Sequence, residues 1–549
     1  MKKIIIVGGV AGGAAAAARL RRLDEHASII MFERGEHISY AGCGFPYYIG
    51  GVVGGREELF VQTPEGMKAK YNIDVRTQTE VVSIDRALKN VEARDLATGE
   101  TYRESYDFAV LSPGSKPFVP PIEGARGDGV FTLREPRDAD SIKEYIKRND
   151  PKDAVVVGGG FIGVEVAENL TDAGIRVTIV ELSNQLLAPF DMDAACEIHG
   201  YIKQRGVALS LGCAVNKISW GGGRLALETS RGPLAADMVI MAAGVVPESA
   251  LASKAGLDVN SRAGIIVDET MRTSDACIYA VGDAVETFDF FTGQASMVPL
   301  AGPAAKQARI AADNICGIRS VYDGTQGSAV IKIFGKTAAA TGLSEKSAKR
   351  LGIECDKQFL YLPDRAAYYP GSEMISMKVV YEKPSGKILG AQVFGPEGAV
   401  KRCDALAVAI RAGMDADDLA KLELCYSPPY SNAKDPVNIA GFAIGNALSG
   451  RVKNFHWHDV DALLQEGGAT CVDVRDAREC REGMIDGFVN IPLGELRDKL
   501  GGLDKSKKVY VCCQSGARSY AASRILSQNG FEVYNLCGGY RLYRAVKSN

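Results

Sequence analysis

The sequence predicts an α/β protein of several domains, and three observations support this prediction. Two segments share one plan, in which a short β-branched run, a glycine-rich turn and an alanine-rich helix precede a second strand that ends in glutamate. This plan covers residues 4–33 and again residues 154–181, and a smaller α/β pattern occupies residues 455–549. Strands that alternate with helices form parallel sheets, so all three patterns indicate sheets covered by helices.

Length and composition indicate a globular protein with about three to four domains, since domains average ~150 residues. The 549 residues are 46% hydrophobic and 24% charged, which is enough apolar material for sizeable cores. The formal net charge is only −3 and no long basic run is present, which argues against a nucleic-acid partner. The 13 cysteines are an odd number without the framework of a small disulfide-bonded domain, which favours a reducing compartment.

The N-terminus imitates an export signal, because Lys2 and Lys3 precede an apolar run. Glycines interrupt that run and three arginines follow it, so a strand, turn and helix explain the pattern better. No stretch of 18 apolar residues is present, so we expect no membrane span and a cytoplasmic location. An i, i+2 histidine pair, His456 and His458, lacks a third ligand nearby, and we predict no metal site.

The second glycine turn has the features of a dinucleotide site. Gly158, Gly160 and Gly163 follow a strand and begin a helix, where a pyrophosphate can approach the backbone at the positive end of the helix. Glu181 ends the next strand, where its carboxylate can accept hydrogen bonds from ribose hydroxyls. Residues 182–185 contain no Arg or Lys for a 2′-phosphate, which favours NADH and leaves NADPH use open.

The first glycine turn departs from the usual pattern, because Val10 takes the place of the central glycine between Gly8 and Gly13. Alone, this turn is also compatible with an ordinary βαβ connection. Glu33 after the second strand and the distant pair Gly282-Asp283 favour a second dinucleotide site.

With these motifs, residues 1 to about 445 resemble the two-dinucleotide disulfide oxidoreductase family, in which an FAD domain, an inserted NAD(P)H domain and an interface domain follow one another. Residues 111–114, 241–244 and 278–283 resemble its connecting motifs and its second FAD motif. The resemblance implies that Glu33 holds the FAD ribose, Asp283 the ribityl chain, and that Glu165 lies near the nicotinamide. The residues expected to bind FAD are Gly8, Val10, Ala11, Gly13, Glu33, Gly282 and Asp283, and those expected to bind NAD(P)H are Gly158, Gly160, Gly163, Glu165 and Glu181.

Cys43 is the predicted redox centre of this part of the chain. The glutathione-reductase branch of the family has two cysteines in this segment, but here Ser39 takes the first position, so Cys43 has no local partner. A single thiolate beside a flavin can still form a mixed disulfide or a sulfenic acid. No histidine occurs between His199 and His456, so the His–Glu acid of that branch is missing, and Ala11 replaces the histidine of NADH peroxidases.

Tyrosines are the predicted replacement for the missing acid. Residues 367–371 and 425–430 closely resemble coenzyme A-disulfide reductases, in which one tyrosine from each segment reaches the cysteine of the partner subunit of a homodimer. The resemblance implies that Tyr368 and Tyr426 have this role, and a phenol can donate a proton to a departing thiolate. It also implies that Arg19 and Arg22, with Ser39, bind coenzyme A, although a solvated charged helix face is an equally simple interpretation of the arginines.

The C-terminal pattern contains a second reactive cysteine. Residues 513–519 lie between a strand and a helix, where a loop can direct its amides at one sulfur and stabilise a thiolate or a persulfide. This segment resembles the active loop of rhodaneses, which implies that Cys513 accepts sulfane sulfur and that Arg518 closes the loop or holds an anionic donor. An inactive rhodanese-like binding module is the alternative.

The predicted function is that of a homodimeric, NAD(P)H-dependent flavoprotein that reduces coenzyme A persulfide, polysulfide or coenzyme A disulfide through Cys43, with a rhodanese domain that handles sulfane sulfur. The alternatives are an NADH oxidase or peroxidase that uses a Cys43 sulfenic acid, and a sulfur carrier or redox sensor. The predicted domains are an FAD domain (1–150 and 276–323), an NAD(P)H domain (151–275), a dimerisation domain (324–448) and a rhodanese domain (455–549).

Overall fold

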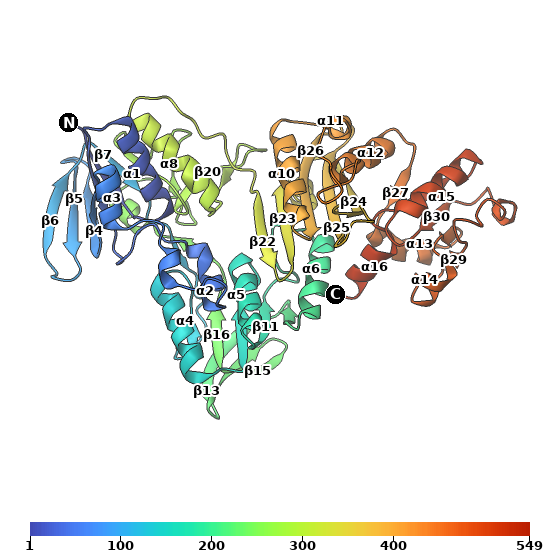
Figure 1. The fold of residues 1–549 in the computed structure, drawn as a ribbon, viewed down its shortest axis with the longest axis horizontal. Helices are drawn as coiled ribbons and strands as arrows, with labels where there is room; N and C mark the ends of the chain where they lie inside the picture. The colour runs from blue at the N-terminus through green and yellow to red at the C-terminus, as the bar shows by residue number, and fades with distance from the viewer. The chain divides into compact units, whose positions relative to one another are not determined.

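The computed structural model describes all residues, 1–549, and divides into two compact units (Figure 1). The first unit contains residues Met1–Leu182 and Ser210–Gln326, and the second contains Ser183–Leu209 and Gly327–Asn549. Each unit is described by itself below. No helix of the structure is both long enough and apolar enough to cross a membrane.

The N-terminal sheet of the first unit is parallel and follows the predicted βαβ plan. Its strand order is β19 (Ile278–Ala280), β7 (Phe108–Leu111), β1 (Lys3–Val7), β2 (Ser28–Phe32) and β3 (Asp74–Arg76). Helices α1 (Ala11–Leu23) and α8 (Ala301–Ile315) pack side by side, and the apolar residues Ile4, Ile5, Ile6 and Leu20 are fully buried. An antiparallel sheet of β4 (Thr79–Asp85), β5 (Asn90–Asp95) and β6 (Thr101–Ser105) adjoins it.

The second parallel sheet has the order β12 (Ala208–Leu211), β11 (Arg176–Glu181), β10 (Asp153–Val157), β16 (Met238–Met241) and β9 (Val130–Phe131). Helix α5 (Phe161–Asp172) follows the glycine turn, and a small antiparallel sheet contains β13 (Val215–Gly221), β14 (Arg224–Thr229) and β15 (Gly232–Ala236). Helix α2 (Phe45–Ile49), which comes directly after Cys43, packs against both α5 and α4 (Pro136–Asn149). The redox segment therefore rests on the helix that starts at the second glycine turn.

The second unit begins with a five-stranded antiparallel sheet of order β22 (Ala329–Ile333), β23 (Lys336–Gly342), β26 (Ile388–Gly395), β25 (Met374–Glu382) and β24 (Cys355–Pro363). Helix α10 (Gly398–Arg411) packs on β23 and β26, while α11 (Ala416–Lys421) and α12 (Pro436–Leu448) pack together. Helix α6 (Met192–Gln204) packs on β25 and β26, although in the chain it lies between strands of the second parallel sheet.

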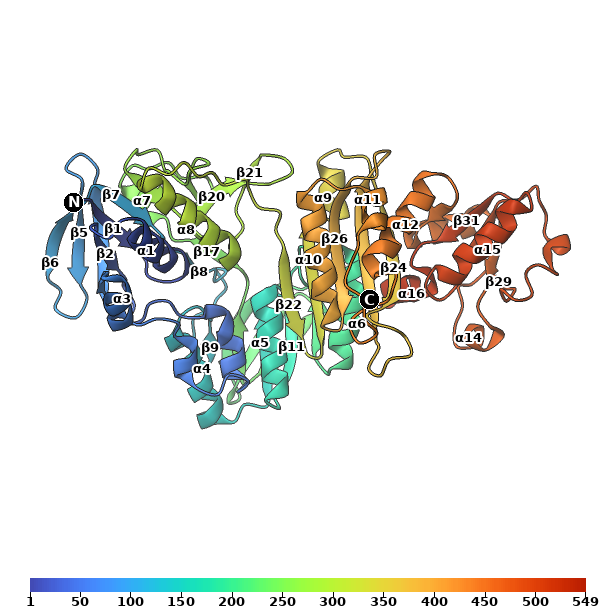
Figure 2. The ribbon, with the colours of Figure 1, turned by 45° about the horizontal axis from the view of Figure 1, so that its top comes forward.

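The C-terminal domain is a parallel sheet with the order β27 (Lys453–Phe455), β31 (Val533–Leu536), β30 (Val509–Cys512), β28 (Thr470–Asp473) and β29 (Val489–Asn490). Its helices are α13 (Val460–Glu466), α14 (Ala477–Arg481), α15 (Ala517–Gln528) and α16 (Gly539–Lys547), and Figure 2 shows α15 and α16 in a second view. The predicted α/β fold class, with an α+β domain and a small C-terminal α/β domain, is confirmed.

Candidate functional site

Both predicted glycine turns are packed so tightly that they require glycine. A Cβ atom on Gly13 would lie 1.8 Å from the carbonyl oxygen of Gly8, and one on Gly163 would lie 2.0 Å from that of Gly158. Val10 is tolerated because its φ of −94° is negative, so the position does not need the left-handed backbone that favours glycine, and because a Cβ atom at the equivalent Gly160 would meet nothing within 4 Å. The missing central glycine therefore does not alter the first turn.

The glutamates at the ends of the second strands hold these turns in place. Glu33 accepts hydrogen bonds from the backbone N–H groups of Gly9 and Gly35, both at 2.8 Å. Glu181 accepts one from the N–H of Gly159 at 2.7 Å, so the two predicted nucleotide sites have the same construction.

A cavity of about 610 Å³ lies beside the first turn, with Gly8, Glu33 and Lys116 among its lining residues. Asp283 accepts a hydrogen bond from Ser115 Oγ at 3.1 Å, and the N–H of Gly282 donates to Gln307 at 2.8 Å. The cavity, the glycine turn and the two carboxylates fit a dinucleotide such as FAD, since its pyrophosphate needs close backbone approach and its hydroxyls need acceptors.

Cys43 is exposed and lies in a short 3-10 turn (Gly42–Gly44) immediately before α2. Partial desolvation of its sulfur raises the pKa of the thiol, and the charges of Glu165 and Asp283 raise it further, whereas Arg134 lowers it. The fold thus brings together three side chains that the sequence predicted as site residues and that lie more than 100 positions apart.

Glu165 lies near the start of α5, just past its first turn, and has an unusual ionisation. Burial, with a smaller contribution from the charge of Glu168, raises the pKa of the Glu165 carboxyl to about 7. The hydrogen bond from the Tyr47 hydroxyl, at 3.2 Å, acts in the opposite direction and lowers this pKa. A carboxyl group that titrates near pH 7 is suited to accept and return a proton beside a redox centre. Sequence reasoning missed Tyr47, which is four residues after Cys43 on the helix that packs against α5.

The three residues predicted to bind coenzyme A differ in their surroundings. Arg19 is committed to an ion pair with Asp313 of α8 at 2.7 Å, whereas Arg22 is exposed. Ser39 has a φ of 49°, and its N–H donates to the carbonyl of Gly9 at 2.9 Å. Ser39 therefore joins the segment before Cys43 to the first glycine turn.

Tyr368 and Tyr426 are exposed, at 78% and 51%, on two loops of the second unit. The loops are held together by Arg402, which sequence reasoning missed. Its fully buried guanidinium forms an ion pair with Asp435 at 2.8 Å and donates to the carbonyl of Asp364 in the first loop at 2.7 Å. The tyrosines are thus displayed by a rigid support.

The loop after β30 encloses the sulfur of Cys513, which is fully buried. The N–H of Gly516 lies 3.2 Å and the hydroxyl of Ser519 lies 3.3 Å from this sulfur, and both donate to it. Arg518 donates two hydrogen bonds of 2.7 Å to Glu479, so in this structure it braces the loop. Donors directed at one sulfur at the start of a helix can hold a sulfur-loaded cysteine by hydrogen bonds.

A buried ion pair also supports the loop that contains Cys513. Arg475 pairs with Asp473 at 2.7 Å, stacks over the ring of Tyr540, and donates to the side chain of Gln514 at 3.2 Å. No local sequence pattern predicts this structural role of Asp473 and Arg475.

Three family models match successive parts of the chain. The model for pyridine nucleotide-disulphide oxidoreductases matches residues 2–308, that for their dimerisation domain matches 329–436, and that for rhodanese-like domains matches 456–545. The chain is 36% identical to an NADH oxidase of Methanocaldococcus jannaschii (80% of this chain, 97% of that protein) and 33% identical to a coenzyme A disulfide reductase of Staphylococcus epidermidis (80% and 99%).

Two solved structures match along nearly the whole chain. Reduced Bacillus anthracis CoADR-RHD is 46% identical, with a TM-score of 0.97 and coverage of 100% of this chain and 98% of that chain. An NAD-dependent persulfide reductase from A. fulgidus is 37% identical, with a TM-score of 0.92 and coverage of 98% and 99%.

Proposed function

The chain belongs to the pyridine nucleotide-disulphide oxidoreductase family and is an FAD- and NAD(P)H-dependent enzyme with a rhodanese-like domain, and we propose that it reduces coenzyme A persulfide, polysulfide or coenzyme A disulfide at Cys43. The observation that carries the proposal is the exposed Cys43, whose thiol is influenced by the charges of Glu165 and Asp283, with Ser39 where a second cysteine would stand. Similarity to a persulfide reductase and to a coenzyme A disulfide reductase supports the same substrates.

FAD, when bound beside the first glycine turn, supplies the two-electron chemistry that links NADH to sulfur. The Cys43 thiolate attacks the outer sulfur of the persulfide, the sulfur–sulfur bond breaks, and coenzyme A leaves as its thiolate. Two electrons from NADH then cleave the sulfur–sulfur bond of the Cys43 persulfide and give the Cys43 thiolate and hydrosulfide. The proton released by NADH goes to the coenzyme A thiolate. Glu165 holds a proton near pH 7 and therefore controls the charge that faces Cys43.

The proposed active enzyme is a homodimer, because the chain contains a dimerisation domain of this family and displays Tyr368 and Tyr426 on its surface. We infer that these hydroxyls assist the leaving thiolate at Cys43 of the partner subunit. Of the two arginines predicted to bind coenzyme A, only Arg22 is available, because Arg19 forms an ion pair with Asp313. All 13 cysteines are free, which supports a location in the reducing cytoplasm.

An NADH oxidase that uses a Cys43 sulfenic acid is the second candidate function, favoured by the 36% identity to a protein of that name. Ala11, at the exposed start of α1, provides no proton donor for peroxide, which favours the persulfide substrate. A sulfur carrier or redox sensor is the third candidate, and it predicts slow turnover with every substrate.

Anaerobic NADH oxidation by the FAD-loaded protein tests these candidates, with coenzyme A persulfide, coenzyme A disulfide and hydrogen peroxide offered in parallel. We expect sulfide and free coenzyme A in step with NADH, lost in Cys43→Ser and retained in the control Cys316→Ser. Rapid turnover with peroxide alone would establish the oxidase or peroxidase function instead.

A further inference from the structure

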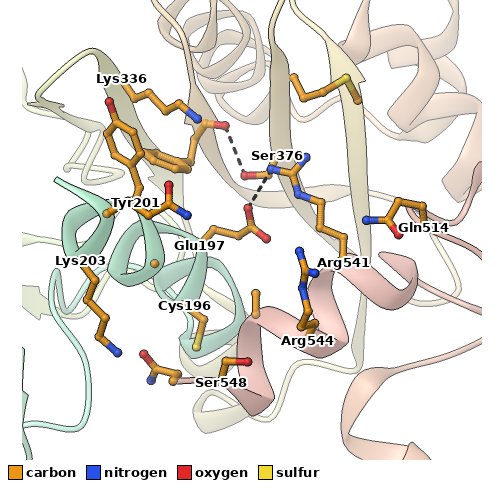
Figure 3. A pocket seen from close by; sticks show the side chains of 16 residues that line it. Cys196, Glu197, Tyr201, Lys203, Lys336, Ser376, Gln514, Arg541, Arg544 and Ser548 are labelled. Atoms are coloured by element: carbon orange, nitrogen blue, oxygen red, sulfur yellow. Dashed lines mark hydrogen bonds and ion pairs between the residues drawn. The ribbon is translucent and has the colours of Figure 1, made fainter. Parts of the chain in front are cut away.

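A second cavity, of about 420 Å³, lies within the second unit between α6, the antiparallel sheet and α16 (Figure 3). None of its lining residues belongs to the site described above except Gln514, which supports the Cys513 loop. Its volume lies within the range of ~300–1,000 Å³ that small-molecule sites occupy. The lining residues used below are Lys203, Lys336, Arg541, Arg544, Gln514 and Tyr201.

The charges around this cavity favour an anion. Four cationic side chains line it, whereas Glu197 is its only carboxylate side chain. Glu197 is already engaged, since it accepts a hydrogen bond from Tyr361 at 2.8 Å and pairs with Arg541 at 3.2 Å. Lys203, Lys336 and Arg544 form no ion pair, so three positive charges remain for a ligand.

The cavity adjoins the sulfur-carrying loop. Gln514 lines it and follows Cys513 directly in the chain. The N–H of Arg541 donates to the carbonyl of Gln514 at 3.0 Å, and the N–H of Tyr540 donates to that of Cys513 at 2.8 Å. The first turn of α16 thereby joins Arg541, which lines the cavity, to Gln514, the residue next to Cys513.

The cavity also has an apolar side, which an inorganic oxyanion does not need. The rings of Tyr201 and Phe394 lie 5.8 Å apart, and Met374 beside them is 39% exposed. Figure 3 shows Lys336 next to the Tyr201 ring, where its ammonium lies 4.7 Å from the ring centre. Cations next to an aromatic surface match an organic molecule that bears phosphate.

We propose that this cavity binds the phosphate groups of a phosphorylated thiol that takes sulfane sulfur from Cys513. The inference rests on the proposed function in one respect, since it takes the thiol to be of the coenzyme A class. The thiolate of this carrier attacks the outer sulfur of the Cys513 persulfide, the bond between the two sulfurs breaks, and a carrier persulfide and the Cys513 thiolate result. The same carrier persulfide is the substrate proposed for Cys43.

The test measures sulfur transfer by the full-length, FAD-loaded protein. Thiosulfate loads Cys513 and releases sulfite, and the acceptor is coenzyme A, 4′-phosphopantetheine, pantetheine or cyanide. The variant Lys203→Gln/Arg544→Gln removes two unpaired cations of the cavity, and Arg497→Gln/Lys508→Gln removes two exposed cations elsewhere on the C-terminal domain.

We expect the KM for coenzyme A to rise about tenfold in the cavity variant, with no change for cyanide or pantetheine and none in the control. A similar rise for 4′-phosphopantetheine would assign the effect to its phosphate, and competition of inorganic phosphate with coenzyme A that is lost in the cavity variant would support a phosphate site. An unchanged KM for coenzyme A, or an equal loss with cyanide, would overturn the proposal. NADH oxidation with added coenzyme A persulfide should survive in the variant, and its absence in the wild-type protein would refute the proposed function separately.

Discussion

The ionisation of Glu165 makes a sharp prediction about the reactivity of Cys43. Because burial raises the pKa of Glu165 to about 7, half of the molecules carry its negative charge at neutral pH. That charge is one of the causes that raise the pKa of Cys43. The neutral variant Glu165→Gln removes this charge, so once Glu165 is ionised in the wild-type protein the variant should have more Cys43 thiolate and react about tenfold faster.

The assay is the pH dependence of Cys43 alkylation by iodoacetamide, followed by mass spectrometry of the Cys43 peptide. Below about pH 6 Glu165 is protonated, so variant and wild-type protein should react at the same rate. The ratio of the two rates should rise through pH 7 and approach about ten near pH 8.5. Glu144→Gln, an exposed carboxylate on α4, serves as the control. A ratio of one at all pH values would refute the coupling of Glu165 to Cys43.

Four further substitutions test other parts of the site. Gly13→Ala would place a methyl group 1.8 Å from the carbonyl of Gly8, so the purified protein should lack flavin absorbance; normal FAD content would contradict the tight turn. Tyr426→Phe and Tyr368→Phe should lower kcat with coenzyme A persulfide about 10- to 100-fold while anaerobic reduction of the bound flavin by NADH stays unchanged, and full activity in both would remove them from the mechanism. Arg518→Gln loses two hydrogen bonds to Glu479 and should slow thiosulfate:cyanide sulfur transfer about tenfold without an effect on NADH-dependent reduction, whereas an equal loss of both activities would indicate misfolding.

Those parts of the fold and site that depend on local sequence could be predicted. The strand predicted at 154–157 is β10 (Asp153–Val157), and the helix after its glycine turn is α5. Glu33 directly follows β2, Glu181 ends β11, and both bond to the glycine turns. These features follow from alternation of apolar residues and from backbone geometry, both of which act within a few residues.

Long-range partners could not be predicted, because no local pattern encodes them. Tyr47 meets Glu165 across 118 positions, and Arg541 meets Glu197 across 344. Arg402 lies on an ordinary helix, and only the fold shows that its buried guanidinium joins two loops. The second cavity escaped prediction for the same reason, since α6, the antiparallel sheet and α16 meet only in the folded chain.

His456 shows how one such long-range contact fastens the C-terminal domain to the antiparallel sheet. Burial opposes its positive charge, but hydrogen bonds to Asp356, at 3.0 Å, and to Cys537 raise its pKa to about 9. A pKa raised from 6.5 makes the charged pair stabilising at low pH. This contribution is complete below about pH 6.5 and is lost as the pH rises through 9, and it amounts to at most about 3 kcal/mol. His456 thus has a structural contact with the antiparallel sheet.

Thermal unfolding of the C-terminal domain, resolved by calorimetry of the full chain, measures the effect. Between pH 7 and pH 9.5 its transition temperature should fall in the wild-type protein, and it should be lower but nearly independent of pH in His456→Gln. His458→Gln is the matched control, because this ring is 43% exposed and lies 3.6 Å from Asp459. If all three proteins lose the same stability over this pH range, other groups cause the loss and the His456–Asp356 pair does not fasten the domain.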